Sequence, residues 1–163
     1  MLRYISIDPG KNTGYFIFDI DDQKNIIERE ISSGSITQVI DIVKHQKALF
    51  NSNLYLLVED ARLCKWVGGH GKNTLQGVGS VKRDCSIWQD FCLENNIIVW
   101  LINPIKIKNK KLTKEQFNKL FDVTCLKNNS HSRDAVAIGM QFGLLANMLI
   151  NSPNFKNQII NYI

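Results

Sequence analysis

Short runs in which hydrophobic and polar residues alternate begin the chain. Three such runs span 3–8, 15–20 and 26–31, and the polar turns DPGKNTG and DDQKN separate them. A two-residue alternation is typical of β-strands, and short polar turns between such strands are typical of hairpins. The N-terminal part of the chain is therefore predicted to form a three-stranded antiparallel meander.

Helical periodicity dominates most of the remaining sequence. Apolar residues recur at three- and four-residue spacing in four predicted helices, at about 36–50, 75–95, 113–121 and 132–150. Capping-box spacings support the first and third of these, because Ser35 lies three residues before Gln38 and Thr113 three residues before Gln116. These helices are expected to present one apolar face to a core.

Two further strands lie between these helices. The run LYLLVE at 54–59 is typical of a strand buried on both faces, and 97–102 predicts a fifth strand. Strands that are reached through helices pair in parallel, so the sheet is expected to be mixed. With the short helix at 113–121 set aside, the order is βββαβαβα. This order predicts an α/β protein in which a mixed five-stranded sheet has helices on both faces. It resembles the order of the ribonuclease H-like fold, and by this analogy we expect that fold.

Length and composition predict one globular domain. A chain of 163 residues with 44% hydrophobic and 21% charged residues is long enough to bury a core and is not typical of a disordered protein. Pro153 would end the last helix, because proline lacks the backbone N–H that a helix needs. We expect a single domain over 1–150 and a loosely docked C-terminal tail over 151–163.

The charge balance is compatible with a polyanionic partner, since 20 Lys and Arg residues against 15 Asp and Glu residues give a net charge of +5. The 4 cysteines form no CxxC pair, which argues against a zinc site and favours reduced core residues. No segment has the pattern of a membrane span or a leader peptide. We expect a protein of the cytoplasm of a bacterial or phage-infected cell, and the Asn-, Ile- and Lys-rich composition suits an AT-rich phage or bacterial genome.

Two predicted strands end in a carboxylate. Asp8 closes the first apolar run and Glu59 closes the fourth. If these strands are neighbours, both side chains lie at the carboxyl edge of the sheet, where open α/β sheets bind ligands. In NSHSRDAVAIGM, His131 and Asp134 are three residues apart at the start of the last helix and can project from one face. These four residues are candidate catalytic and metal-binding residues.

Each of these side chains also has a purely structural interpretation. Asp8 suits a turn, Glu59 suits an ion pair with Arg62, and Asp134 and His131 suit the first turn of a helix. Carboxylates that meet at one sheet edge, however, repel one another unless a cation neutralises them. An oxygen-rich cluster with at most one imidazole suits Mg²⁺ or Mn²⁺ better than zinc.

These motifs, in this order, resemble the RuvC family of Holliday junction resolvases, and more closely its small phage-encoded branch. DPGKNTGY at 8–15 is similar to the opening motif of the family, with a loop one residue shorter, and Glu59 matches its second acid. In HSRDAVAI, Asp134 matches the final acid and His131 the position three residues before it. The resemblance extends to about Met148.

The resemblance implies a metal-dependent endonuclease that resolves Holliday junctions by symmetric paired nicks. Two Mg²⁺ ions, which Mn²⁺ can replace, would support phosphodiester hydrolysis, with Asp8, Glu59, His131 and Asp134 as metal ligands and catalytic residues. His131 could instead relay a proton. Because two strands are cut about a two-fold axis, the resemblance also implies a homodimer, with branched DNA as partner and no organic cofactor.

Basic and aromatic residues near the predicted active edge are candidate DNA contacts. One group follows the second acid, and another follows the fifth strand. They comprise Arg62, Lys65, Trp66, Lys72, Lys82, Arg83, Lys106 and Lys108, with Lys110 and Lys111 beside the last two. Lysine clusters are also common on solvated surfaces that bind nothing. Members of the RuvC family carry an aromatic residue shortly after the second acid, where this chain has Arg62.

Several alternatives stay open. The helix at 75–95 offers a dimer contact at Trp88, Gly77 and Gly79, although Trp88 suits the monomer core equally well. The protein could be a nuclease of broader specificity for forks, flaps and three-way junctions. It could be an actin-like nucleotide-binding protein whose DPG turn cradles phosphate, but that class needs a second domain. A non-catalytic DNA-binding factor would be expected to have lost one of the acids, and all are present.

Overall fold

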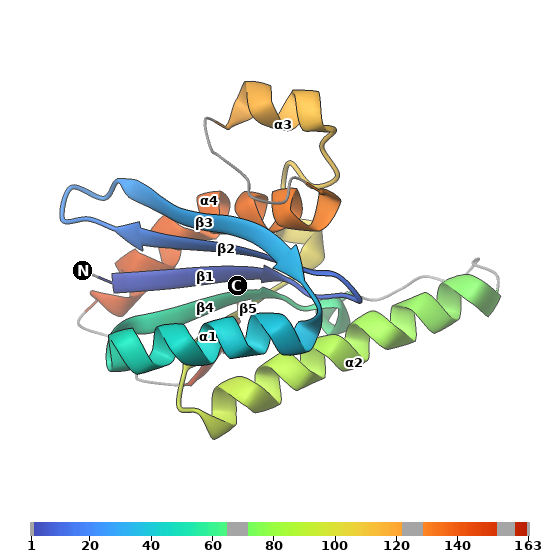
Figure 1. Cartoon of the computed structure of the whole chain (residues 1–163), viewed down its shortest axis with the longest axis horizontal. Coiled ribbons are helices and arrows are strands. Elements are labelled where there is room, and N and C mark those ends of the chain that lie inside the picture. The colour runs from blue at the N-terminus through green and yellow to red at the C-terminus, as the bar shows by residue number, and fades with distance from the viewer. Residues whose placement is uncertain (1, 65–71, 122–128, 153–158, 163) are drawn as a thin grey trace.

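The computed structural model describes residues 2–64, 72–121, 129–152 and 159–162, with the backbone alone described at 72–76 and 78. Strands and helices alternate after an initial meander, as the hydrophobic pattern predicts (Figure 1). The main elements are β1 (Leu2–Asp8), β2 (Thr13–Ile20), β3 (Ile26–Gly34), α1 (Ile36–Phe50), β4 (Leu54–Glu59), α2 (Lys72–Glu94), β5 (Ile98–Ile102), α3 (Lys114–Leu120), α4 (Ser130–Ile150) and β6 (Ile160–Tyr162). Short 3₁₀ turns, η1 (Asn51–Asn53), η2 (Ala61–Leu63) and η3 (Pro104–Lys106), link some of them.

One mixed sheet organises the molecule, with the strand order β3-β2-β1-β4-β5-β6. The first three strands are antiparallel, and β4, β5 and β6 continue the sheet in parallel with β1. The expected number of five strands is wrong, because Ile160–Tyr162 of the expected C-terminal tail adds a sixth. A three-residue strand is too short to leave a periodic signal in the sequence, and it forms because the edge of β5 offers unpaired backbone groups.

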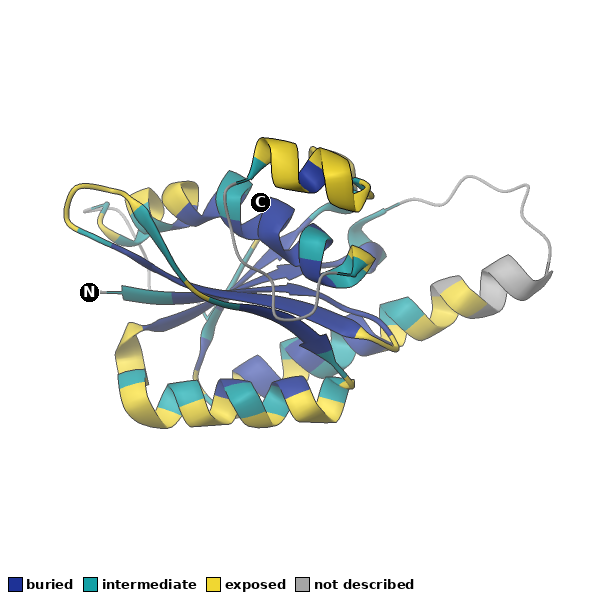
Figure 2. Cartoon of the chain, turned by 45° about the horizontal axis from the view of Figure 1, so that its top comes forward, coloured by how far each residue is buried: buried dark blue, intermediate teal, exposed yellow. Residues whose placement is uncertain are grey.

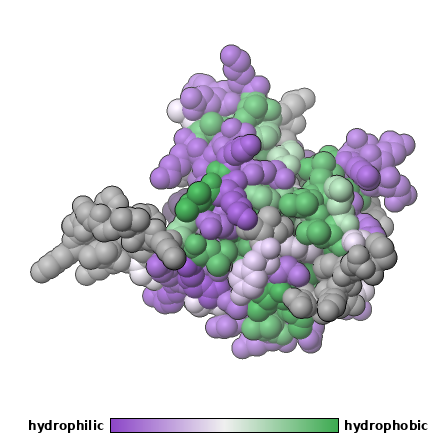
Figure 3. Space-filling view, turned by 180° about the vertical axis from the view of Figure 1, so that it is seen from behind, coloured by the Kyte–Doolittle hydropathy of each residue, from purple (hydrophilic) through white to green (hydrophobic). Residues whose placement is uncertain are grey.

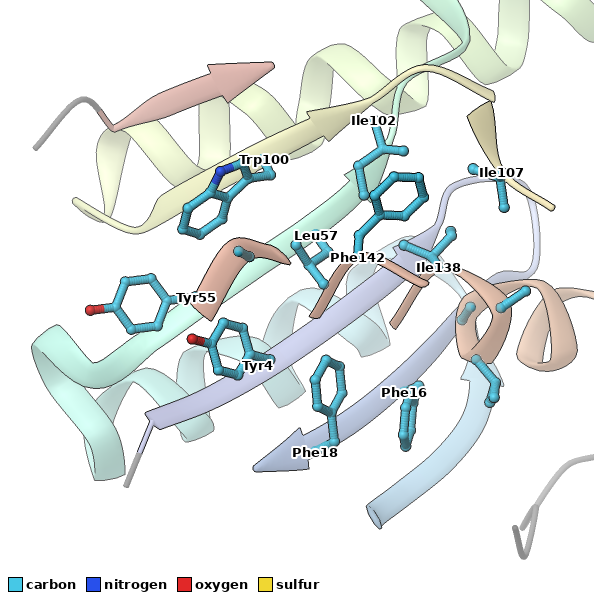
Figure 4. Packing of buried hydrophobic residues seen from close by; sticks show 14 of the residues in the cluster. Tyr4, Phe16, Phe18, Tyr55, Leu57, Trp100, Ile102, Ile107, Ile138 and Phe142 are labelled. Carbon is cyan, nitrogen blue, oxygen red and sulfur yellow. The ribbon is translucent and has the colours of Figure 1, made fainter. Parts of the chain in front are cut away.

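Helices cover both faces of the sheet, as the element order predicts (Figure 2). On one face, α1 and α2 pack through residues such as Val43 and Trp88. On the other face, α4 packs on an aromatic cluster that includes Tyr4, Phe16 and Phe18, which Figure 4 shows lying side by side on β1 and β2. Alternate residues of each central strand serve the two cores, since side chains of a strand point to opposite faces in turn.

Local capping signals set the helix starts as expected. Ser35 with Gln38 and Thr113 with Gln116 both form complete capping boxes. The last helix begins two residues earlier than the apolar pattern predicts, at Ser130, because the Asn129 side chain accepts a hydrogen bond from the backbone N–H of Ser132. These two extra residues put His131 within the helix.

Close approach of α4 to the sheet fixes where that helix begins. A Cβ atom on Gly139 would lie 2.6 Å from the Phe16 ring and 2.7 Å from Ser6 Oγ, so only glycine fits there. The buried Ser6 hydroxyl donates a hydrogen bond of 2.7 Å to the Ala135 carbonyl. Because these contacts seat α4 on β1 and β2, the first turn of the helix lies near the end of β1.

Trp88 belongs to the monomer core, so of its two interpretations the core position is confirmed and the dimer contact is wrong. Its side chain is completely buried and meets Phe91 edge to face. Helical spacing alone could not distinguish the two positions, because one apolar stripe serves a core and an interface equally well. Gly77 and Gly79 are exposed on α2, and a part in dimerisation remains a prediction for them. Over the described ranges, none of the helices is long and apolar enough to cross a membrane.

Candidate active site

The parallel pairing of β1 with β4 brings Asp8 beside Glu59. Ile7 is the register partner of Val58, so the next residue of each strand lies at the same edge of the sheet. Strand alternation turns both carboxylates toward the face that α4 covers. Asp8 is 7% exposed and Glu59 is 8% exposed, so both acids are buried although they end their strands. The structure thus brings together the two acids that the strand pattern singled out.

The first turn of α4 supplies the other two predicted residues. A Cβ on Gly14 would lie only 2.0 Å from the carbonyl oxygen of His131, so this glycine lets the helix start touch β2. His131 Nδ1 lies 2.8 Å from Asp8 Oδ2, within hydrogen-bond distance. Asp134 is buried, and its Oδ1 accepts a 2.7 Å hydrogen bond from the backbone N–H of Lys111. All four predicted catalytic side chains therefore lie at one site.

Lys110 is a member of this site that the sequence analysis did not single out. Its ammonium group donates to Glu59 Oε2 and lies 4.0 Å from Asp8 Oδ1. Within the run Lys106, Lys108, Lys110 and Lys111, nothing in the sequence distinguishes this lysine from its neighbours. The alternative, purely structural interpretation of Glu59 as the ion-pair partner of Arg62 is wrong, because Lys110 is the partner of Glu59 and Arg62 pairs with Asp60.

The charge balance of the site favours the uptake of cations. Burial, and then repulsion from Asp8, raises the pKa of Glu59 to about 7. Burial also raises the pKa of Asp134, even though the Lys111 amide favours its ionised form. The hydrogen bond to Asp8 raises the pKa of His131. Burial lowers the pKa of Lys110, but the facing carboxylates outweigh this effect and raise it. The positive charge of Lys110 and His131 is thus too small to neutralise all three acids.

The donor chemistry of the site fits a divalent metal ion, although an ammonium group stands among the carboxylates. In the part of the chain that the structure describes, no three or more His, Cys, Asp or Glu side chains are arranged to hold a metal. Asp8, Glu59 and Asp134 nevertheless lie together at the sheet edge as buried oxygen donors, and the pKa of Glu59 and that of Asp134 are raised. Oxygen-rich sites of this kind suit Mg²⁺ or Mn²⁺.

Arg62, a candidate DNA contact, is bound by several side chains of the protein itself. Its guanidinium forms a forked pair with Asp60, with Nε–Oδ1 and Nη2–Oδ2 distances of 2.8 Å. It also donates to Ser86 Oγ, at 3.0 Å, and to Gln89. These bonds join the segment after β4 to α2, so Arg62 has a structural role, and a DNA contact by it stays a prediction.

The other candidate DNA contacts are only partly described. Lys106 and Lys108 are exposed on the segment after β5, Lys82 is half-buried on α2, and the exposed Arg83 pairs with Asp84 at 3.1 Å. Lys65 and Trp66 lie outside the described residues, as does the side chain of Lys72. The N-terminal part of α2 projects beyond the body of the molecule, on the side to which β1 points (Figure 1). This end of α2 therefore lies on the same side as the carboxyl end of β1.

No model of a known protein family matches this chain, and no curated protein sequence is significantly similar to it. Solved structures, however, are similar. One is T. thermophilus RuvC in complex with a Holliday junction substrate, with a TM-score of 0.60 and 15% sequence identity, covering 90% of this chain and 96% of that one. The resemblance to RuvC in the ordered motifs is thus matched by a resemblance in structure. The chain has the ribonuclease H-like fold that the order of its elements predicts.

Proposed function

We propose that this protein is a divalent-metal-dependent endonuclease that nicks branched DNA, and that four-way junctions are its main substrate. The observation that carries the proposal is the meeting of Asp8, Glu59 and Asp134 at the carboxyl edge of the sheet, all buried and with the pKa of two of them raised. The shared fold with RuvC, a protein solved with a Holliday junction substrate, supports the choice of DNA structure. We place its action in the cytoplasm of a bacterial or phage-infected cell.

Asp8, Glu59 and Asp134 are the residues that would hold two Mg²⁺ ions, or Mn²⁺ in their place. Such ions, when bound, would activate a water molecule and neutralise charge on the scissile phosphate and the leaving oxygen. Asp8 is suited to a central ligand because its strand contacts both β4 and α4, and its carboxylate lies close to both Lys110 and His131.

His131 is held in one orientation by Asp8. The 2.8 Å contact engages Nδ1, which leaves Nε2 as the ring nitrogen for a ligand bond or a proton transfer. The same contact raises the pKa of the imidazole, so a larger share of it is protonated near neutral pH. The ring could then give a proton to the leaving oxygen from Nε2.

Symmetric nicks on a four-way junction require two such sites, so the proposed active form is a homodimer. Lys82, Arg83, Lys106 and Lys108 would contact phosphates on either side of the scissile bond. Their contacts would fix the position of the DNA and carry no base specificity. The dimer surface does not include the buried Trp88.

A second candidate function is a nuclease of broader specificity for forks, flaps and three-way junctions. The observation that favours it is Arg62, which stands where members of the RuvC family carry an aromatic residue. Its guanidinium is tied to Asp60 and Ser86, and it cannot stack at a junction centre as a ring does without losing these bonds. This candidate shares the metal chemistry and differs only in substrate preference.

A cleavage assay on matched labelled substrates tests both candidates. An immobile four-way junction, a three-way junction, a flap and a linear duplex would each be incubated with Mg²⁺ and with EDTA, beside an Asp8→Asn control. Paired symmetric nicks confined to the four-way junction support the main proposal. Equal cutting of all branched forms supports the broader nuclease. Cutting that persists in EDTA or in Asp8→Asn contradicts the metal site.

A further inference from the structure

Lys110 differs sharply from the lysines around it. Lys106 and Lys108 are exposed, whereas the side chain of Lys110 is only 20% exposed and its ammonium group meets Glu59 and approaches Asp8. Burial of an ammonium group is costly unless carboxylates compensate it. Lys110 is therefore part of the acid cluster, and the carboxylates of the cluster hold its side chain in position.

The segment that carries Lys110 is tied to α4 by several hydrogen bonds. The Gln141 side chain accepts from the backbone N–H of Lys108 at 2.8 Å and donates to the carbonyl of Lys106 at 2.7 Å. Arg133 Nε donates to the Leu112 carbonyl at 2.9 Å. Lys111 is held in turn by its bond to Asp134. Bonds before and after Lys110 thus fix the backbone that presents it.

The backbone conformation on both sides of Lys110 also needs such support. Asn109 has φ 60° and Lys111 has φ 58°, both in the left-handed region that non-glycine residues seldom adopt. Residues stay in this region when the surrounding contacts over-determine them, and they do so most often at functional sites. Lys110 lies in a turn between these two residues, and its side chain meets the acids.

We propose that Lys110 is a tethered cation that neutralises the Asp8–Glu59 pair in the metal-free protein and competes there with the divalent ion. This inference rests on the proposed metal site. The ammonium group supplies the positive charge that the carboxylates require, and an incoming metal ion has to displace it. Lys110 is therefore a positioning residue, which preserves the acid cluster while no metal is bound and weakens the affinity of the site for metal.

Binding of Mn²⁺ in the absence of DNA tests this role without using activity. By isothermal titration calorimetry, the Lys110→Met variant should bind Mn²⁺ about tenfold more tightly than the wild type, because a unit charge that opposes the ion at short range has been removed. Lys108→Met is the matched control: it removes the same charge from an exposed position on the same segment and should change the affinity by less than about twofold.

Thermal unfolding of the same variants gives a second readout. Metal-free Lys110→Met should melt below the wild type, because three acids have lost their ammonium partner, and saturating Mn²⁺ should raise its Tm by more than it raises that of the wild type. If the methionine variant does not fold, Lys110→Gln keeps a hydrogen-bond donor for Glu59 without the charge, and the same tighter binding is expected of it.

Two results would overturn the inference in different ways. Equal or weaker Mn²⁺ binding by Lys110→Met, with binding abolished in Asp8→Asn, would mean that the metal site exists and that Lys110 supports the ion instead of competing with it. No Mn²⁺ binding by the wild type or any variant would remove the metal site itself, and with it both this inference and the proposed function.

Discussion

Two clusters of buried acids and cations lie at opposite ends of β1, and they are balanced in opposite ways. At the start of the strand, the fully buried Asp19 forms ion pairs with two arginines. Its carboxylate oxygens lie 2.7 Å from Arg3 Nε and 2.6 Å from Arg29 Nε. At the end of the strand, Asp8, Glu59 and Asp134 share Lys110 and His131. The first cluster has two cations for one acid, and the second has three acids for one permanent cation and one imidazole.

The pKa shifts follow this difference. Burial tends to raise the pKa of Asp19, but hydrogen bonds from the two arginines outweigh it and the pKa is lowered. Burial likewise raises the pKa of Glu59 and Asp134, and there the available cations do not reverse it. Buried carboxylates therefore have different roles at the two clusters. Where cations are in surplus, the carboxylate stabilises the fold, and where cations are too few, the carboxylates form a site that can bind a metal ion.

The largest effect is expected at the acid-rich end. Asp8→Asn should reduce junction cleavage to background, since the proposed central ligand loses its charge, while DNA binding is retained. The free energy of unfolding should change by less than about 1 kcal/mol, because the lost attraction to His131 and Lys110 is offset by relief of the repulsion from Glu59. Cleavage assays and urea unfolding of one preparation measure both. Normal cleavage would contradict the proposed site.

The matching substitution at the other cluster should affect stability instead. Asp19→Asn leaves Arg3 and Arg29 without their carboxylate, and removing one partner of a buried ion pair costs about 3 to 5 kcal/mol. Arg3 keeps contacts to Gln46 and to the Phe50 ring, which favours the lower end of this range. Urea unfolding provides the measurement. A small change in stability with a large loss of cleavage would reverse the comparison.

Acidification should remove the difference in stability between the wild type and Asp19→Asn. Because the pKa of Asp19 lies below its usual value, its contribution to stability is present above about pH 4 and is lost as the pH falls through the folded-state pKa. The gap in free energy of unfolding between wild type and Asp19→Asn should stay constant from about pH 7 to pH 5 and shrink below about pH 4. Urea unfolding at a series of pH values measures it. A gap that widens with acid would contradict the sign of the pKa shift.

Sequence patterns could locate the acids and His131 but not Lys110. Asp8 and Glu59 were predictable because a charge that closes an apolar strand is unusual, and the fold order puts those strands side by side. Lys110 was not, because its placement depends on bonds from Gln141 and Arg133, which are distant in the sequence. The sixth strand was missed for a similar reason: its partner, β5, decides its conformation. The position of Lys110 and the conformation of the sixth strand depend on long-range contacts and not on local propensity, so the sequence pattern did not predict them.

The next largest effect is expected from the glycine that brings α4 to the acid-rich end. A Cβ on Gly14 would collide with the His131 carbonyl at 2.0 Å, so Gly14→Ala should cost about 1 to 3 kcal/mol and lower cleavage by displacing the first turn of α4. Gly77→Ala is the control, since nothing lies within 4 Å of the added atom on an exposed helix. It should stabilise the protein by about 0.5 to 1 kcal/mol. Urea unfolding and cleavage assays separate the two glycines.

The smallest effect is expected from a lysine that belongs to neither cluster. Lys82→Ala should leave the free energy of unfolding within about 0.5 kcal/mol of the wild type, because within the described ranges the buried acids pair with other cations. If Lys82 contacts a phosphate, junction affinity should fall, and the slope of log affinity against log salt should decrease by about 0.9. Lys44→Ala on α1, on the sheet face opposite α4, is the control and should leave the slope unchanged. Binding titrations at several salt concentrations measure both variants. Equal slopes for Lys82→Ala and the wild type would remove α2 from the proposed DNA surface, and the acid-rich end of β1 would then have to receive DNA through the segment after β5.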